Sequence, residues 1–142
     1  MRSVPSSRCA LHLDGRATPE CLELIHQALA DLWAGAPQVS DLDRYMFATA
    51  LLEVASNTLA HGGAGETRFW LTLSVDADHI RGAFSDDGAE VDLALDAPLP
   101  EDEYAECGRG LAMARMALTE FGYRREDGRN CWQLVRDREP EV

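Results

Sequence analysis

Three short motifs contain the residues of this chain whose types and spacing suit chemistry. In the first, residues 52–62 (LEVASNTLAHG), the side chains of Glu53, Asn57 and His61 interrupt an apolar stretch with helical periodicity. At about 100° per residue, Glu53 and Asn57 share one stripe of a helix, and His61 stands beside it. The stripe either faces a ligand or is the solvated side of an amphipathic helix, the simpler interpretation of this helix alone. Against solvation, residues 45–60 contain only one charged side chain.

The other two motifs are suited to binding a planar base and an anion. Residues 86–88 (DDG) follow a predicted strand, so the sheet would fix the Asp86 carboxylate to accept an amino hydrogen from the edge of a base, and Gly88 would leave room for the ring. Residues 108–111 (GRGL) precede a predicted helix, whose free N–H groups and dipole attract anions. Each motif by itself is also compatible with an ordinary turn or helix cap.

Hydrophobic patterns predict the elements that must position these motifs. Ser40 or Asp41 is suited to begin a helix, and Gly35 and Gly62 are suited to end one. Residues 86–107 form a long connection, and loops of that length are usually functional or mobile. The expected elements are helices over 19–34, 41–61 and 111–121, and strands over 9–13, 67–75, 79–85, 123–125 and 130–136. They predict one domain over residues 1–142, an α+β two-layer sandwich with a mostly antiparallel five-stranded sheet and three helices on one face.

Net charge and composition limit the expected partners. Thirteen basic against 25 acidic residues give a net charge of -12, which repels nucleic-acid phosphates and anionic lipids. Neither a nucleic acid nor a membrane is therefore expected as a direct partner. The N-terminal residues lack the apolar core of a signal peptide and no apolar run approaches ~20 residues, so a cytoplasmic protein is expected. Four scattered cysteines without a C-x-x-C pair predict free thiols.

The order of the motifs is more specific than any one of them. A helix with E-x-x-x-N, a strand ending in D-x-G, a long loop and a helix opened by G-x-G-L resemble the ATPase superfamily of gyrase, the heat-shock-90 chaperone, sensor histidine kinases and MutL, which has the Bergerat-type ATP-binding fold. Within it, the small size and the run GRGLAMARMAL most resemble the bacterial anti-sigma-factor serine/threonine kinases. The resemblance implies ATP and Mg²⁺ as cofactors.

The resemblance implies a role for each polar residue of the first motif. Glu53 would be the general base that takes the proton from an attacking hydroxyl, one helical turn from the metal ligand. Asn57 would supply the side-chain oxygen that binds Mg²⁺ on the ATP phosphates, because Mg²⁺ accepts few protein ligands beside water and phosphate oxygens. His61 would either border the phosphates or cap the C-terminal end of its helix.

The resemblance also implies adenine and phosphate contacts. Asp86 would accept the adenine amino group, Gly88 would pack beneath the purine, and residues 91–106 would form an acidic lid. The phosphate contacts would come from Gly108, Arg109, Gly110 and Leu111, through close backbone approach at the glycines and a charge-assisted contact from Arg109. One departure lies in the late strand, where the superfamily often carries a Thr near the adenine and this chain reads NCWQ over residues 130–133.

Two functions from different classes follow from this resemblance. The first is an ATP-dependent serine/threonine protein kinase and anti-sigma factor, which binds a sigma factor and phosphorylates an anti-sigma-factor antagonist. The alternative is a non-catalytic, ATP-gated interaction module that regulates a signalling partner. The detached catalytic half of a histidine kinase is a third interpretation. The acidic surface suits the basic patches of a sigma factor. The apolar first helix could serve a homodimer, although core packing explains Ile25 and Leu29 equally well.

Overall fold

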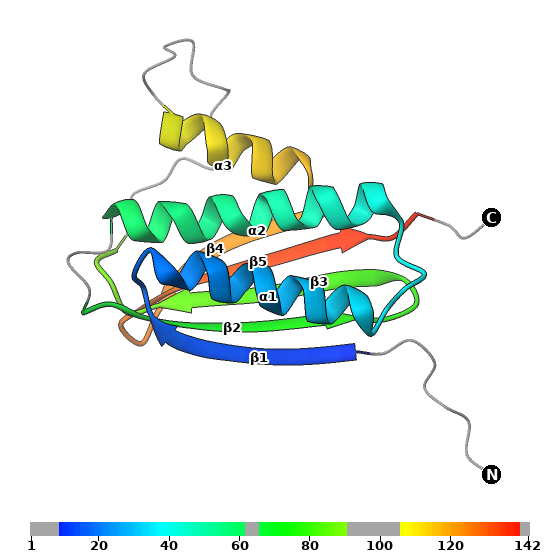
Figure 1. Cartoon of the computed structure of the whole chain (residues 1–142). Coiled ribbons are helices and arrows are strands. Elements are labelled where there is room, and N and C mark those ends of the chain that lie inside the picture. Colours follow the sequence, from blue (N-terminus) through cyan, green and yellow to red (C-terminus); the bar gives the residue numbers. More distant parts are fainter. Residues whose placement is uncertain (1–8, 62–65, 91–105, 140–142) are drawn as a thin grey trace.

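Three helices cover one face of a five-stranded sheet (Figure 1). The computed structural model describes residues 9–61, 66–90 and 106–139, and for His61 and residues 106–110 it describes the backbone alone. The elements are β1 (Cys9–Arg16), α1 (Glu20–Ala34), α2 (Asp41–His61), β2 (Arg68–Val75), β3 (His79–Asp86), α3 (Glu106–Met116), β4 (Glu120–Glu126) and β5 (Arg129–Asp137). This architecture confirms the expected α+β sandwich.

The sheet has the strand order β1-β2-β3-β5-β4, and every neighbouring pair is antiparallel. β5 therefore lies between β3 and β4, although it follows both of them in the chain. The register places Asp86, the last residue of β3, opposite Asn130 of β5 on one side and Phe69 of β2 on the other. One end of the central strands thus gathers residues from three distant segments of the sequence.

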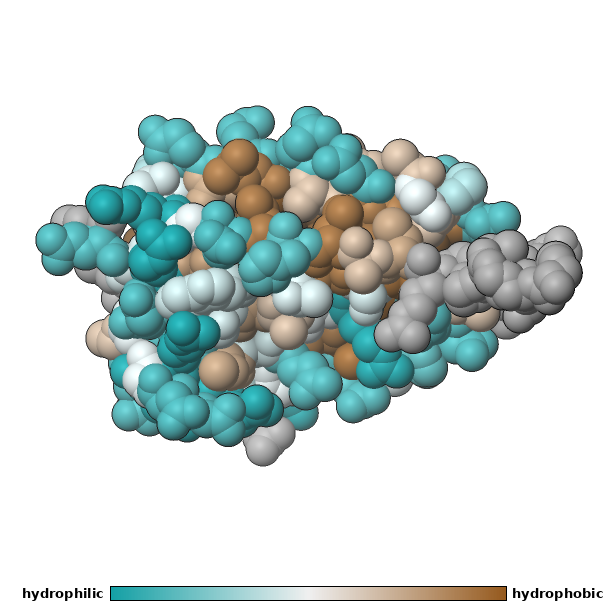
Figure 2. Space-filling view, turned by 90° about the horizontal axis from the view of Figure 1, so that it is seen from below, coloured by the Kyte–Doolittle hydropathy of each residue, from teal (hydrophilic) through white to brown (hydrophobic). Residues whose placement is uncertain are grey.

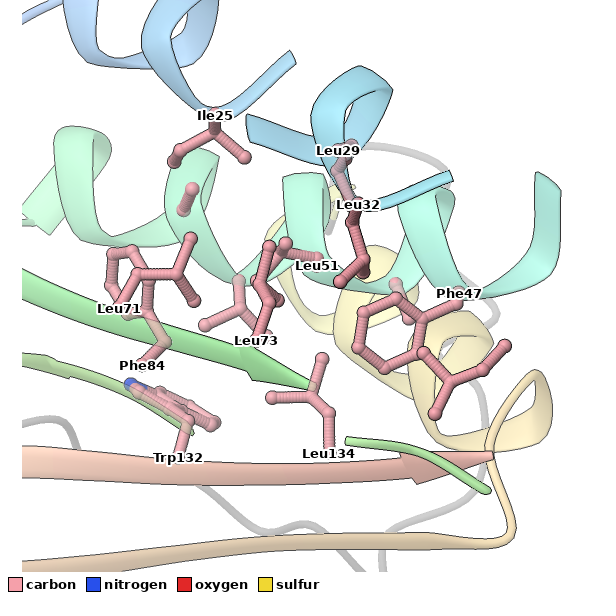
Figure 3. Close-up of a cluster of buried hydrophobic side chains, with 14 of the residues drawn as sticks. Ile25, Leu29, Leu32, Phe47, Leu51, Leu71, Leu73, Phe84, Trp132 and Leu134 are labelled. Carbon is pink, nitrogen blue, oxygen red and sulfur yellow. The ribbon is translucent and has the colours of Figure 1, made fainter. Parts of the chain in front are cut away.

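The hydrophobic core fills the space between the helices and the sheet (Figure 3). In β2 every second residue from Phe69 to Val75 is buried, as the alternating pattern predicts, and the residues between them face away from the helices. The helices contribute Ile25, Leu29 and Leu32 from α1, and Phe47, Leu51 and Val54 from α2. Core packing therefore accounts for Ile25 and Leu29, which are 0% and 3% exposed.

Some apolar side chains remain accessible along the β1 edge. Cys9, Leu11 and Leu13 of β1 pack against the core but are only partly buried, and Leu24 of α1 is 49% exposed. Figure 2, a view from below, shows hydrophobic side chains at the surface among hydrophilic ones. These side chains are accessible to another protein, whereas the apolar face of α1 is buried in the core.

The element ends agree with the expected signals at some positions and differ at others. Ser40 begins α2, since its hydroxyl oxygen accepts the N–H of Asp43 at 3.0 Å. The third helix begins at Glu106 and ends at Met116, so Phe121 lies in β4, not at the end of a helix as expected. The described cysteines, Cys9, Cys21 and Cys131, are free thiols as expected.

The last two described residues, Arg138 and Glu139, are anchored by backbone hydrogen bonds. The backbone N–H of Arg138 donates to the carbonyl of Asp78, and that of Glu139 donates to the Asp43 carboxylate at 2.8 Å. Asp43 is fully buried and also accepts Nε of Arg136 at 2.8 Å. The start of α2 is thereby joined to the last residues of β5.

Candidate functional site

The buried carboxylate of Asp86 is the centre of the site. Asp86 is 2% exposed, and three donors reach it from three different segments. Its Oδ1 accepts the N–H of Gly88 at 2.9 Å and Nδ2 of Asn130 at 2.9 Å, and its Oδ2 accepts the hydroxyl of Thr58 at 3.1 Å. A carboxylate has about four acceptor positions. One acceptor position on Oδ2 is therefore left for a further donor, such as the amino group of a base.

Asn130 holds this carboxylate in place, a contact that no local pattern of the sequence predicts. Its amide Nδ2 donates to Asp86 and also to the carbonyl of Ala89 at 2.9 Å. The Asn130 Oδ1 accepts the hydroxyl of Tyr123 and Nη1 of Arg125. Because both acceptor bonds fix which end of the amide faces Asp86, the orientation of Asn130 is determined by the β4–β5 hairpin.

The loop after β3 is fastened on both sides. Arg125 Nη1 donates to the carbonyl of Gly88 at 2.7 Å, which ties the loop to β4. Asp87 Oδ1 accepts the N–H of Arg68 at 2.7 Å, and the N–H of Asp87 donates to the Arg68 carbonyl. Asp87 is exposed and serves the turn, whereas its neighbour Asp86 is buried and points into the site. Of the two acidic residues of this motif, Asp86 is therefore the one available to a ligand.

The α2 motif divides into a buried and an exposed residue. Asn57 is 6% exposed, and its Nδ2 has no hydrogen-bond partner among the described residues. Glu53, one turn earlier, is exposed and forms no hydrogen bond or ion pair with any described residue. A buried amide without a partner costs about 1–3 kcal/mol, so such groups often serve a ligand rather than the fold. The stripe is therefore not simply a solvated face, because solvation does not explain Asn57.

The glycine motif lies inside α3 and not before it. Gly108 and Gly110 are the third and fifth residues of the helix, so the expectation that they precede its first turn was wrong. The first four N–H groups of a helix have no partner within it, and the N–H of Gly108 is one of these. Leu111 is 4% exposed and belongs to the core. The Arg109 side chain and residues 91–105 of the expected lid lie outside the description.

Comparison with known proteins decides the family. Residues 15–136 match the family model of the histidine kinase-like ATPase domain. The chain belongs to this family. Its fold is similar to that of a crystal structure of the RsbU and RsbW domains of Rv1364c from Mycobacterium tuberculosis, with a TM-score of 0.65 and 20% sequence identity. The similarity covers 94% of this chain and 34% of the other, so the chain spans about a third of that protein.

Two further findings concern curated relatives and the possibility of a membrane span. The sequence has no significant match among curated proteins. No helix within the described ranges has both the length and the apolar composition needed to span a bilayer.

The polar residues of this histidine kinase-like ATPase domain fit a nucleotide with its metal ion. The free acceptor position on Asp86 suits an exocyclic amino group, and Asn57 offers a buried amide whose Nδ2 has no partner among the described residues. An amide oxygen is a ligand type that Mg²⁺ accepts, usually beside phosphate oxygens and water. Thr58 joins the two, since it follows Asn57 in α2 and donates to Asp86.

Asn130 provides a first test of this pocket. We expect Asn130→Ala to weaken ATP binding about tenfold, because Asp86 loses one donor, and the Tyr123 hydroxyl and Arg125 Nη1 lose the acceptor oxygen of Asn130. Calorimetric titration of ATP with Mg²⁺ measures the effect. Cys131→Ala is the matched control, since Cys131 lies on the opposite face of β5, and its affinity should stay unchanged. Equal affinities of the Asn130 variant and the wild type would contradict this role.

Proposed function

We propose that this domain is an ATP-dependent serine/threonine protein kinase that also binds a sigma factor, and that its phosphate acceptor is an anti-sigma-factor antagonist. The observation that carries the proposal is the buried Asp86 with one acceptor position left, together with the buried Asn57 on α2, whose Nδ2 has no partner among the described residues. Membership of the histidine kinase-like ATPase family supports ATP as the ligand. The likeness to a structure named for its RsbU and RsbW domains supports the choice of partners.

Each residue acts on its own part of the ligand. Asp86 accepts a hydrogen bond from the adenine amino group, and Gly88 lies next to it beneath the purine ring. Asn57 holds Mg²⁺ through its amide oxygen, and the N-terminal turn of α3 with Gly108 and Gly110 faces the phosphates. Arg109 adds a charge-assisted contact to these phosphates. When bound, Mg²⁺-ATP supplies the phosphoryl group for transfer.

Glu53 acts on the protein substrate and not on the nucleotide. It is exposed and lies one helical turn from Asn57, so an incoming hydroxyl can approach it from solvent. As general base, its carboxylate takes the proton of the attacking serine or threonine. The absence of any bond from Glu53 to the described residues leaves both of its oxygens available for this proton.

The charge of the chain supports a basic protein partner. At -12, the domain attracts positively charged surfaces such as the nucleic-acid-binding patches of a sigma factor, and it repels nucleic acid itself. A homodimer would use accessible apolar residues, and those beside β1, including Leu11, Leu13 and Leu24, fit this better than the buried face of α1. We place these interactions in the cytoplasm.

The test of the kinase is the substitution Glu53→Gln. We expect transfer of phosphate from radiolabelled ATP to candidate antagonist proteins to fall at least about 100-fold, because general-base catalysis is lost, while ATP affinity stays within about twofold. Glu23→Gln, an equally exposed change on α1, is the control and should transfer phosphate at the wild-type rate. Undiminished transfer by the Glu53 variant would remove the residue from its assigned role.

One observation favours the non-catalytic alternative. Glu53 has no second residue that orients its carboxylate in the described part of the chain, although catalytic bases are often held by such a partner. If the wild type labels none of the candidate antagonists while its affinity for a sigma factor still changes with ATP, the domain is an ATP-gated interaction module.

A further inference from the structure

The face of the sheet opposite the helices has no described element packed on it and contains a hollow of about 500 Å³. Strands β2, β3, β4 and β5 all contribute to its lining. Polar side chains of moderate size form much of the surface: Thr72, Ser74, Ser85 and Gln133. Gln133 lies near the middle, opposite Ala83 of β3 and Gly122 of β4. This hollow is separate from the site around Asp86, whose side chain points to the helix side of the sheet.

Two arginines line the hollow on either side of β5. Arg81 belongs to β3, and its charge acts on the Asp76 carboxylate without a hydrogen bond or close ion pair among the described residues. Arg124 belongs to β4 and pairs only with the exposed Glu126, at 3.2 Å. Exposed pairs of this kind contribute little, so both guanidinium groups remain available to a ligand. They stand out in a chain with 25 acidic residues and a net charge of -12.

A third arginine is held flat on the same face. The Arg129 guanidinium lies 3.6 Å from the centre of the Trp70 ring, in a cation–π contact that spans from β5 to β2. Trp70 pairs with Ser85, which lines the hollow. The contact holds the charge of Arg129 on this face of the sheet. The hollow thus has positive charge at one end as well as at its sides.

The spacing of these charges selects an extended ligand. Arg81 lies opposite Val135, and Arg124 lies opposite Cys131, so they are separated by four residues along β5 and by two strand spacings. At about 3.3 Å per residue and 4.8 Å per strand, their Cα atoms are about 16 Å apart. A single small anion does not reach both. A nucleic acid would, but its dense charge is strongly repelled by the rest of the molecule.

We propose that this face docks an extended segment of a partner protein that carries two or three carboxylates spaced to meet Arg81 and Arg124. The segment's few negative charges pair with the arginines, and its backbone donates to and accepts from the hydroxyl and amide groups of Thr72, Ser85 and Gln133. The proposal does not depend on ATP binding or on phosphate transfer. It gives the domain a second protein-binding surface, of opposite charge to the acidic remainder.

The test uses the full chain and a fluorescein-labelled peptide of about twelve residues with Glu at every fourth position and Ser or Gly elsewhere, which in extended form places its carboxylates on one face at intervals of about 13–14 Å. We expect saturable binding at low salt, measured by fluorescence anisotropy. The double variant Arg81→Gln/Arg124→Gln should bind about tenfold more weakly. Arg16→Gln/Arg115→Gln removes the same charge from exposed positions outside the hollow and should bind as the wild type does.

A second variant blocks the hollow without changing its charge. A Cβ added at Gly122 meets no atom within 4 Å, so Gly122→Trp places a ring beside Gln133 without disturbing the fold. We expect it to reduce peptide binding at least about fivefold, with an unchanged circular dichroism spectrum. The proposal is overturned if neither variant weakens binding, or if the wild type does not bind the peptide. Equal binding of a peptide with Lys in place of Glu, or tighter binding of a single-stranded oligonucleotide, also overturns it.

Discussion

Asp86→Asn loses nucleotide binding, by at least about 100-fold in the dissociation constant of ATP with Mg²⁺. The substitution keeps the size of the side chain but replaces one acceptor oxygen by an NH₂ donor. Asp86 receives three donors and has room for a fourth, so any orientation of the amide sets its hydrogens against another donor. Calorimetric titration of ATP and ADP measures the loss.

The neighbouring residue offers a matched control for this experiment. Asp87→Asn removes the same charge one residue along the chain, at an exposed carboxylate that accepts only the N–H of Arg68. We expect its ATP affinity to remain within about threefold of the wild type, since an amide oxygen accepts the same bond. If both variants bind as the wild type does, the adenine contact is not at Asp86. If the folded wild type binds no nucleotide, the pocket is degenerate and protein partners alone remain.

Asp43→Ala has the largest expected effect on stability, a loss of about 3 kcal/mol in the free energy of unfolding. Asp43 is fully buried and receives Arg136 Nε and the N–H of Glu139, both at 2.8 Å. Without the carboxylate, the charge of Arg136 is left unpaired beneath α2, where its side chain is only 16% exposed. Urea denaturation measures the change. Asp41→Ala, at an exposed position on the same helix, is the control, with an expected loss below about 1 kcal/mol.

The same carboxylate predicts how stability depends on pH. Burial raises the pKa of Asp43, but hydrogen bonds from Glu139, Arg136 and Ser40 together outweigh it, so the pKa lies below its usual value. Because the pKa is lower in the folded state, the ionised carboxylate stabilises the fold at pH values above the ordinary pKa of an unfolded Asp, about 3.9. This contribution is lost as the pH falls through the pKa of the folded state. The difference between wild type and Asp43→Asn should therefore be constant near pH 7 and shrink below about pH 4. A constant difference down to pH 2 would contradict this coupling.

Local patterns predict the sheet and two helices well, but not the end of the third helix. Alternation in β2 and the caps of α2 depend on neighbouring residues, which the sequence displays directly. Residues 117–121 (ALTEF) suit either a helix or a strand, and pairing with β5 decides between them. Phe121 lies opposite Leu134, and its ring stacks on Trp132 at 5.7 Å. That contact belongs to the strand pairing and has no local signal.

In the candidate site, too, local motifs predict some residues, while others depend on strand pairing. The motifs predict Asp86 and Asn57 because each stands out within its own element. Asn130 lies 44 residues from Asp86, and its role depends on the register of β3 with β5. Tyr123 and Arg125 act through Asn130 and are further removed from any local pattern. The final strand has other polar residues, such as Gln133 and Arg136, so Asn130 is distinguished only once the strand partners are known.

The position of β5 between β3 and β4 also bears on how the protein is made on the ribosome. A nascent chain that has released β1, β2 and β3 has β3 paired with β2 on one edge only, and Ile80 and Phe84 still lack their neighbours in β5. β4 cannot join the sheet by itself, because its only strand partner is β5. The donors from Asn130 and the Arg136–Asp43 pair arrive last as well. The hydrogen bonds that hold Asp86 are therefore complete only when the C-terminal hairpin inserts, so a partly synthesised chain lacks the finished candidate site.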